Sequence, residues 1–161
     1  MVKLMKILFT LIFFSIFSCS SDTPVDMDDA LFDSGGRYKS IDSQKVYSGP
    51  GFKKYKNGKK QEEGPLEYGW KVGTWTGWYK DGRKKFVGSY LEGIPDGPWT
   101  GFHPNGQKKY EGDYKFGHQV GKWIYFNKKG NKNLEEDYFV CENDCDESHP
   151  SLGKIIKSEK F

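Results

Sequence analysis

Residues 97–117 read GPWTGFHPNGQKKYEGDYKFG, with Asn105-Gly106 at the centre and an aromatic-rich run on each side. An Asn-Gly or Asp-Gly pair between two such runs predicts a β-hairpin, because a type I′ turn needs positive φ at both central residues. The same dipeptide position recurs every 24 residues, at Asn57-Gly58, Asp81-Gly82 and Lys129-Gly130. The sequence therefore predicts a repeated hairpin unit.

Other positions share this spacing of 24 residues. Three of them hold glycine and three hold aromatic side chains, while the first copy departs from the aromatic pattern with Gly51, Lys54 and Leu66. The glycines are Gly49, Gly73, Gly97 and Gly121; Gly64, Gly88 and Gly112; and Gly69, Gly93 and Gly117. The aromatic residues are Trp75, Trp99 and Trp123; Trp78, Phe102 and Phe126; and Tyr90, Tyr114 and Tyr138.

The second copy illustrates the strands that this pattern predicts. Residues 73–80 enter the hairpin and residues 83–91 leave it, and Ile94-Pro95-Asp96 forms the return turn. Side chains alternate between the two faces of a strand, so both faces carry aromatic residues. One face is expected to hold Trp75, Gly77 and Tyr79, and the other Thr76 and Trp78.

The repeat resembles the variant form of the MORN repeat. The shared pattern is Gly-x-Trp-x-x-(Tyr/Phe)-x-x-(Asn/Asp)-Gly-x-x-Lys-x-x-Gly-x-Tyr-x-x-Gly, and the resemblance covers about residues 47–138. It implies an all-β fold, an elongated single-layer antiparallel meander of hairpins, in agreement with the turns. It also implies a binding or scaffolding role, and bacterial members of the family include proteins labelled as antitoxin components.

Residues 1–18 are predicted to be a lipoprotein signal peptide, since Lys3 and Lys6 precede an apolar run over residues 7–17. At ~1.5 Å per residue this run is shorter than the ~30 Å core of a bilayer. Its end, Ile16-Phe17-Ser18-Cys19, resembles a bacterial lipobox, so we expect lipidation of Cys19 and membrane anchoring. An ordinary secretory signal is the alternative. Serines instead of an aspartate follow Cys19, which in such lipoproteins favours the outer membrane.

The rest of the chain divides into three predicted parts. Residues 19–45 are polar and locally acidic and are interpreted as a tether, with an irregular strand within residues 32–39. Residues 46–140 form the hairpin array and residues 141–161 a C-terminal cap or tail. Without residues 1–18 the chain has 23 basic side chains (25 minus two lysines) and 22 acidic ones. Balanced, interspersed charge argues against nucleic acid as a partner and gives no reason for the array to bind lipid.

The sequence contains no catalytic motif such as Gly-x-Ser-x-Gly or His-Glu-x-x-His, and residues 117–122 lack the spacing of a P-loop. His103 and His118 fall at different positions of the repeat. A carboxylate-based hydrolase would need two acids across a cleft. Acids are plentiful within residues 61–63 and 135–137, but we interpret them as solvated strand ends. We therefore expect a protein that is not an enzyme and has no cofactor.

Cys141 and Cys145 form a candidate disulfide. An extended segment would separate their Cα atoms by ~13 Å, beyond the ~7 Å limit, so the bond requires a bend in the chain. A metal site using Cys141, Cys145 and His149 is the alternative. An exported location favours the disulfide.

The sequence favours an envelope-anchored interaction or scaffolding module, because a repeat array offers a protein partner an extended surface. One alternative is a glycan-binding or peptidoglycan-binding module that uses the aromatic columns, and another is an envelope immunity or antitoxin-like protein. Each aromatic side chain could instead be buried between hairpins. The candidate binding residues are Trp78, Tyr79, Phe102, His103 and Phe126.

Overall fold

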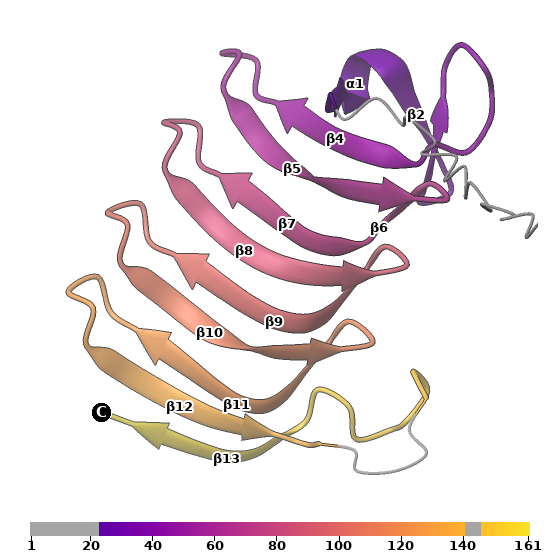
Figure 1. Ribbon diagram of the computed structural model, residues 1–161. Coiled ribbons are helices and arrows are strands. Elements are labelled where there is room, and N and C mark those ends of the chain that lie inside the picture. The colour runs from indigo at the N-terminus through magenta and orange to yellow at the C-terminus, as the bar shows by residue number, and fades with distance from the viewer. Residues whose placement is uncertain (1–22, 141–145) are drawn as a thin grey trace, which may run out of the picture.

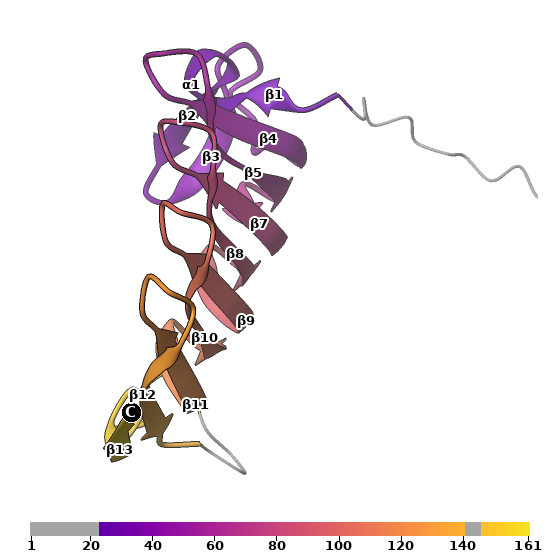
Figure 2. The same cartoon turned by 90° about the vertical axis from the view of Figure 1, so that its left-hand side faces the viewer.

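The structure, a computed structural model, describes residues 23–140 and 146–161. Its main feature is an eleven-stranded sheet in the order β1-β4-β5-β7-β8-β9-β10-β11-β12-β13, with β6 paired to β5. The hairpins follow one another along the sheet (Figure 1) and descend as a single layer when viewed from the side (Figure 2). Every pair is antiparallel except β1 with β4, and the two ends of the sheet do not meet. The predicted all-β class is confirmed.

The N-terminal elements are β1 (Val25–Asp26), α1 (Met27–Ala30), β2 (Leu31–Ser34) and β3 (Arg37–Ser40). The remaining strands are β4 (Gly49–Lys54), β5 (Lys60–Glu67), β6 (Trp70–Lys71), β7 (Gly73–Trp78), β8 (Lys84–Leu91), β9 (Ile94–Phe102), β10 (Lys108–Lys115), β11 (His118–Phe126), β12 (Lys132–Tyr138) and β13 (Ile155–Lys160).

The hairpin loops contain three residues. In the second loop the Tyr79 carbonyl accepts a hydrogen bond from the Gly82 N–H, and the Tyr79 N–H donates to the Arg83 carbonyl, both at 2.8 Å. Gly82 has a φ of +93°, whereas Asp81 does not have positive φ. This is a type I turn followed by a left-handed glycine. The hairpins are confirmed, but the predicted type I′ turn is wrong at this loop, and the other three loops have the same two bonds.

Type I′ geometry occurs instead at the return turns. Leu91 pairs with Ile94 across a two-residue loop in which Glu92 has a φ of +48° and Gly93 a φ of +87°. Two positive φ values in a two-residue loop define the type I′ turn. The return turn predicted at residues 94–96 is therefore wrong, because these residues begin β9.

Gly106→Val is expected to lower the free energy of unfolding by about 1–3 kcal/mol, because a β-branched residue is strained at positive φ. Gly106 has a φ of +88°, and an added Cβ would meet no other atom within 4 Å, so the cost comes from the backbone alone. Gly106→Asn should retain most of the stability, since asparagine enters the left-handed region more readily. Urea unfolding measures both variants. A valine variant as stable as the wild type would contradict a left-handed conformation at this position.

One face of the sheet, here called the tryptophan face, carries the aromatic core. Trp75 is 0% exposed and Trp123 is 1% exposed. Each indole lies over a glycine of the neighbouring strand, so that a Cβ at Gly88 would come within 2.1 Å of Trp99. Tyrosines pack edge-on between the indoles, an arrangement that aromatic rings favour. The alternating row, with centroid distances of 5.0–6.5 Å, is Trp75, Tyr90, Trp99, Tyr114, Trp123 and Tyr138.

The N-terminal segment folds against the first hairpin. Met27 of α1 and Leu31 of β2 are 1% and 5% exposed and pack with Leu66 and Trp75. Asp26 caps α1 by accepting a hydrogen bond from the Asp28 N–H. The tether prediction is therefore wrong for residues 25–40, and the single strand expected within residues 32–39 is the β2–β3 hairpin. Burial of two apolar side chains outweighs the polar composition of the segment.

The C-terminal segment extends the sheet, because β13 pairs with β12. Residues 1–22 and 141–145 lie outside the described residues, and with them the predicted signal peptide, Cys19, Cys141 and Cys145. Among the residues that are described, no helix has the length and apolar character needed to cross a membrane.

Candidate interaction surface

The face opposite the core, here called the lysine face, carries a row of alternating lysine and aromatic side chains. Trp78 lies on this face because side chains alternate along β7 and Trp75 points to the core. The neighbouring strand places a lysine directly across from each aromatic residue of the row. The cross-strand pairs are Trp78 with Lys84, Phe102 with Lys108, and Phe126 with Lys132.

Lysine ammonium groups lie over the rings of this row. Lys60 Nζ is 5.5 Å from the centroid of the Trp78 ring, and Lys84 Nζ is 6.0 Å from that of Phe102. At such distances an ammonium is attracted to the face of the ring. Trp78, Phe102 and Phe126 are half-buried, and none of them belongs to either core cluster of the described residues. Their rings therefore remain partly available to a partner.

Acidic residues neutralise part of the row. Lys84 is the exception. A glutamate lies three residues after each of the other lysines of the row, whereas Val87 lies three residues after Lys84. Within residues 23–140 and 146–161, Lys84 makes no ion pair. Hydrogen bonds from Lys122 and Lys132 hold the pKa of Glu135 down, at about 2. The pairs are Lys60–Glu63 at 2.5 Å, Lys108–Glu111 at 2.6 Å, and Lys132–Glu135.

Two of the predicted binding residues have their polar atoms engaged within the sheet. The Tyr79 hydroxyl donates to the Phe102 carbonyl at 2.7 Å. His103 Nε2 lies 2.8 Å from the Phe126 carbonyl and must carry the proton there, because a carbonyl only accepts. Tyr79 and His103 thus join successive hairpins, and Trp78, Phe102 and Phe126 remain the aromatic candidates for binding.

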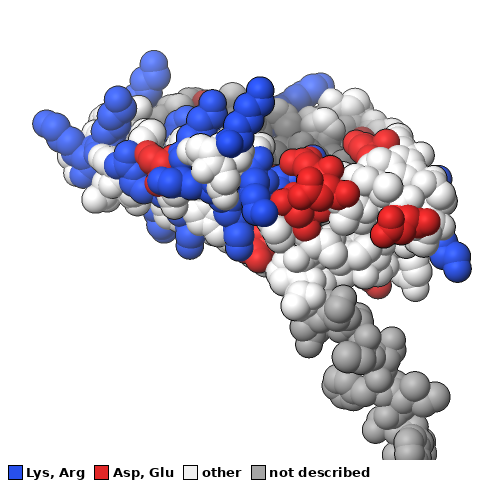
Figure 3. Space-filling view, turned by 90° about the horizontal axis from the view of Figure 1, so that it is seen from above, with Lys and Arg blue, Asp and Glu red and all other residues white. Residues whose placement is uncertain are grey.

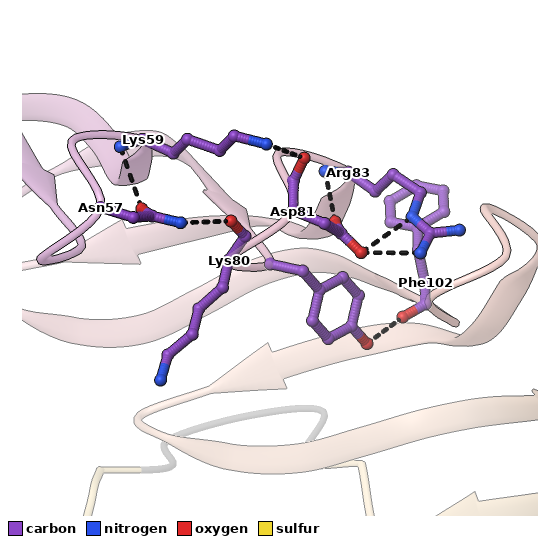
Figure 4. A network of polar contacts seen from close by, with 7 residues as sticks. Asn57, Lys59, Lys80, Asp81, Arg83 and Phe102 are labelled. Carbon is purple, nitrogen blue, oxygen red and sulfur yellow. Dashed lines mark hydrogen bonds and ion pairs between the residues drawn. The ribbon is translucent and has the colours of Figure 1, made fainter.

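The first two hairpin loops are also joined by side chains, as Figure 4 shows. The Asn57 amide donates to the Lys80 carbonyl at 2.9 Å, and Lys59 Nζ donates to the Asp81 carbonyl at 2.7 Å. Arg83 donates to the Asp81 carboxylate through Nε at 3.0 Å and Nη2 at 2.7 Å, and these bonds lower the pKa of Asp81. The loops therefore form a connected row. The sequence analysis identified Asn57 and Asp81 only as turn residues. The signal it missed is the repetition of the contact, because Asn105 at the equivalent position donates to the Lys128 carbonyl at 2.6 Å.

Basic residues gather along this row of loops, here called the loop edge and defined as residues 53–60, 80–85, 104–109 and 128–132. Lys and Arg side chains concentrate toward the left of Figure 3, the side on which the hairpin loops lie in Figure 1. The four segments contain fourteen lysines and arginines and a single carboxylate, that of Asp81. The expectation of interspersed charge is wrong for this surface. The net charge is close to zero, but basic and acidic side chains lie on different parts of the molecule.

Two shallow depressions lie beside the first two loops. Each combines ammonium groups with a ring or an amide, which suits a carboxylate or another anionic group. One is lined by Lys54, Tyr55, Lys56, Asn57, Gln61 and Lys80, and the other by Lys59, Lys60, Trp78 and Gly82.

Tyrosines of the core are expected to make the fold sensitive to alkaline pH. Burial raises the pKa of Tyr90 from 10.0 to about 12 and also raises the pKa of Tyr110, Tyr114 and Tyr138. A group whose pKa is higher in the folded state contributes stability that is present below its unfolded pKa and is lost as pH rises toward the folded value. We expect unfolding between about pH 10 and pH 12, followed by circular dichroism and by phenolate absorbance at 295 nm. Complete ionisation of all tyrosines near pH 10 with the fold intact would contradict this burial.

The other predicted site residues can be placed only in part. The His149 ring stacks on Phe139 with centroids 5.0 Å apart, and its Nδ1 accepts a hydrogen bond from the Ser151 N–H at 3.3 Å. Within the described ranges, no three His, Cys, Asp or Glu side chains are grouped as metal ligands would be. The Cys141–Cys145 disulfide and the alternative metal site with His149 stay predictions.

Comparison of the chain with protein-family models, with curated proteins and with solved structures found no match.

Proposed function

We propose that this protein is a lipid-anchored interaction module of the cell envelope, built on MORN-like hairpin repeats of 24 residues, and that it binds an acidic partner protein along its loop edge. The observation that carries the proposal is the segregation of charge, with fourteen basic residues and one carboxylate at that edge. Six of the fourteen pair with carboxylates, and the other eight make no ion pair within the described residues. Basic surfaces steer and orient acidic partners.

The geometry of the loops supports an elongated partner. Successive loops are two strands apart, which corresponds to roughly 9.6 Å, so lysines recur at this interval along the array. The contacts from Asn57, Lys59, Tyr79 and His103 hold neighbouring loops together. Loops that are already held in place lose little backbone freedom when they bind, which favours affinity.

Binding of an acidic glycan is the second candidate function. It is supported by Trp78, Phe102 and Phe126, which are half-buried and lie outside the core clusters of the described residues. Rings of this kind can stack on sugars while the adjacent lysines pair with carboxylates. The same surface would serve both partners, so the bound material must be identified by experiment.

Crosslinking in cells, followed by purification from detergent-solubilised envelopes and mass spectrometry, tests the proposal. The wild type is expected to retain a reproducible acidic protein, and Lys56→Glu/Lys80→Glu should lose it, since both lysines line one depression. The matched control is Lys45→Glu/Lys154→Glu, which changes the net charge equally at exposed sites away from the loop edge. Equal recovery with both double variants would refute binding at this edge, and recovery of polysaccharide alone would favour the second candidate.

Anchoring is tested separately with Cys19→Ala, which is expected to release the protein into soluble fractions. A variant that still requires detergent for extraction would refute a lipid anchor at Cys19.

A further inference from the structure

Strand β13 leaves one edge of the sheet open. Within the described ranges β13 pairs only with β12, and all six of its residues are exposed. Ile155, Ile156 and Phe161 are 51%, 68% and 61% exposed. An exposed edge strand with apolar side chains is a template for pairing with another strand.

The first long strand at the other end of the sheet, β4, is protected. β1 pairs with β4, and Met27 of α1 packs in the core cluster beneath it. Lys54 of β4 pairs with Asp26 at 3.0 Å, and Lys53 lies 3.8 Å from Asp28. The two ends of the array therefore differ, and the strand-pairing surface lies at β13.

The hydrogen bonds of β13 show which backbone groups face outward. The Phe161 N–H donates to the Asn133 carbonyl on the β12 side. Because antiparallel strands alternate between hydrogen-bonded and non-hydrogen-bonded positions, Lys157 and Glu159 also direct their backbone groups to β12. Ser158 and Lys160 direct theirs to the open edge, where a second strand can accept and donate.

We infer that β13 pairs with β13 of a second copy, antiparallel, about a two-fold axis at Ser158. In this register Lys157 lies opposite Glu159 of the second copy, and the symmetry creates this pair twice. Opposite charges that face each other across strands are stabilising, and a two-fold interface requires such self-complementarity.

Neighbouring registers are unfavourable. Moving the axis to Lys157 would place two lysines opposite each other, and moving it to Glu159 would do the same with two glutamates. Within one chain Glu159 already lies opposite Glu135 on β12. Lys157 of the same chain lies 3.7 Å from the Glu159 carboxylate, and the lysine of the second copy would supply a second cation on its free side. Charge complementarity therefore selects one register and one occupant.

Sedimentation velocity of the full-length protein in detergent, over a range of concentrations, tests the inference. A dimer is expected for the wild type. Lys157→Glu and Glu159→Lys should each weaken dimerisation at least ~10-fold, because each replaces two attractive pairs with two repulsive ones. The combined Lys157→Glu/Glu159→Lys variant restores opposite charges at both pairs and should dimerise again, as should an equimolar mixture of the two single variants.

A backbone variant provides an independent test. Ser158→Pro removes an N–H that faces the open edge, so it should abolish the dimer with little change in melting temperature. Glu159→Pro removes an N–H on the β12 side and should also loosen β13 from the sheet. A monomeric wild type, or a dimer unaffected by Ser158→Pro and by both charge reversals, would overturn the inference. Protection of β13 amides from exchange only in the presence of another envelope protein would also overturn it.

Discussion

Trp75→Ala is expected to lower the free energy of unfolding by about 3–5 kcal/mol, the range for removing a fully buried tryptophan. Trp75 is 0% exposed, and it packs with Met27, Leu31 and Leu66. Its indole N–H also donates to the Pro65 carbonyl at 3.0 Å. Loss of this side chain leaves a void between the sheet and the N-terminal segment that packs on it. Urea unfolding followed by circular dichroism measures the change.

Trp78→Ala is the matched control for this prediction. The two tryptophans are on the same strand, but Trp78 is half-buried on the lysine face and lies outside the core clusters of the described residues. The ammonium of Lys60 lies 5.5 Å from its ring centroid, and loss of this contact at a half-buried site should cost about 1 kcal/mol. Similar losses for both variants would contradict the assignment of the core to the tryptophan face.

The all-β class and the hairpins could be predicted from the sequence, because glycine and aromatic residues each mark a different structural requirement. Glycine is needed where the chain turns or where an indole lies directly above the backbone, as at Gly88 beneath Trp99. Aromatic residues are needed where a thin sheet must bury apolar area. Recurrence of both types at fixed positions therefore predicted the strands and their ends.

The turn types could not be assigned from the same residues. Asn-Gly suits both a type I′ turn and a type I turn followed by a left-handed glycine, and the difference is one residue of loop length. At the return turns Tyr68, Glu92 and Phe116 adopt positive φ, although these residue types seldom do so. Pairing of the flanking strands imposes this conformation, and local sequence does not reveal such tertiary effects.

The N-terminal cap was missed for a related reason. Residues 25–40 contain few apolar side chains, which is typical of a tether. Met27 and Leu31 nevertheless cover Leu66 and Trp75 at the end of the core. What decides the fold of this segment is an apolar surface elsewhere in the chain, so composition alone did not indicate it.

The candidate surface was predicted only in its aromatic part. Trp78, Phe102 and Phe126 were identified as candidates, whereas the lysines across from them were not. The net charge suggested that basic and acidic side chains are interspersed. Strand pairing instead brings the loop lysines together at one edge, while most carboxylates lie along the strands. The repeat spacing could have predicted this row of lysines, because a lysine occurs two residues after each loop glycine, at Lys60, Lys84, Lys108 and Lys132.

Gly88→Ala is expected to lower the free energy of unfolding by about 3 kcal/mol, because overpacking a tight core typically costs 1–3 kcal/mol. An added Cβ would lie 2.1 Å from Trp99 Cε3 and 2.2 Å from Cδ2. Neither the ring nor the paired backbone can move without disturbing neighbours, since Trp99 packs against Tyr90 and Tyr114 at 5.3 and 5.4 Å. Thermal and urea unfolding measure the loss.

A double-mutant cycle with Trp99→Leu separates this clash from any other effect of alanine in the strand. Leucine is smaller than indole, so Gly88→Ala should cost far less in the Trp99→Leu background than in the wild type. The expected coupling is about 2 kcal/mol, within the range for residues in direct contact. Equal costs in the two backgrounds would mean that the glycine is required by the backbone and not by the ring above it. Since Gly88 is not at positive φ, the backbone gives no such requirement, and the indole is the reason for glycine at this position.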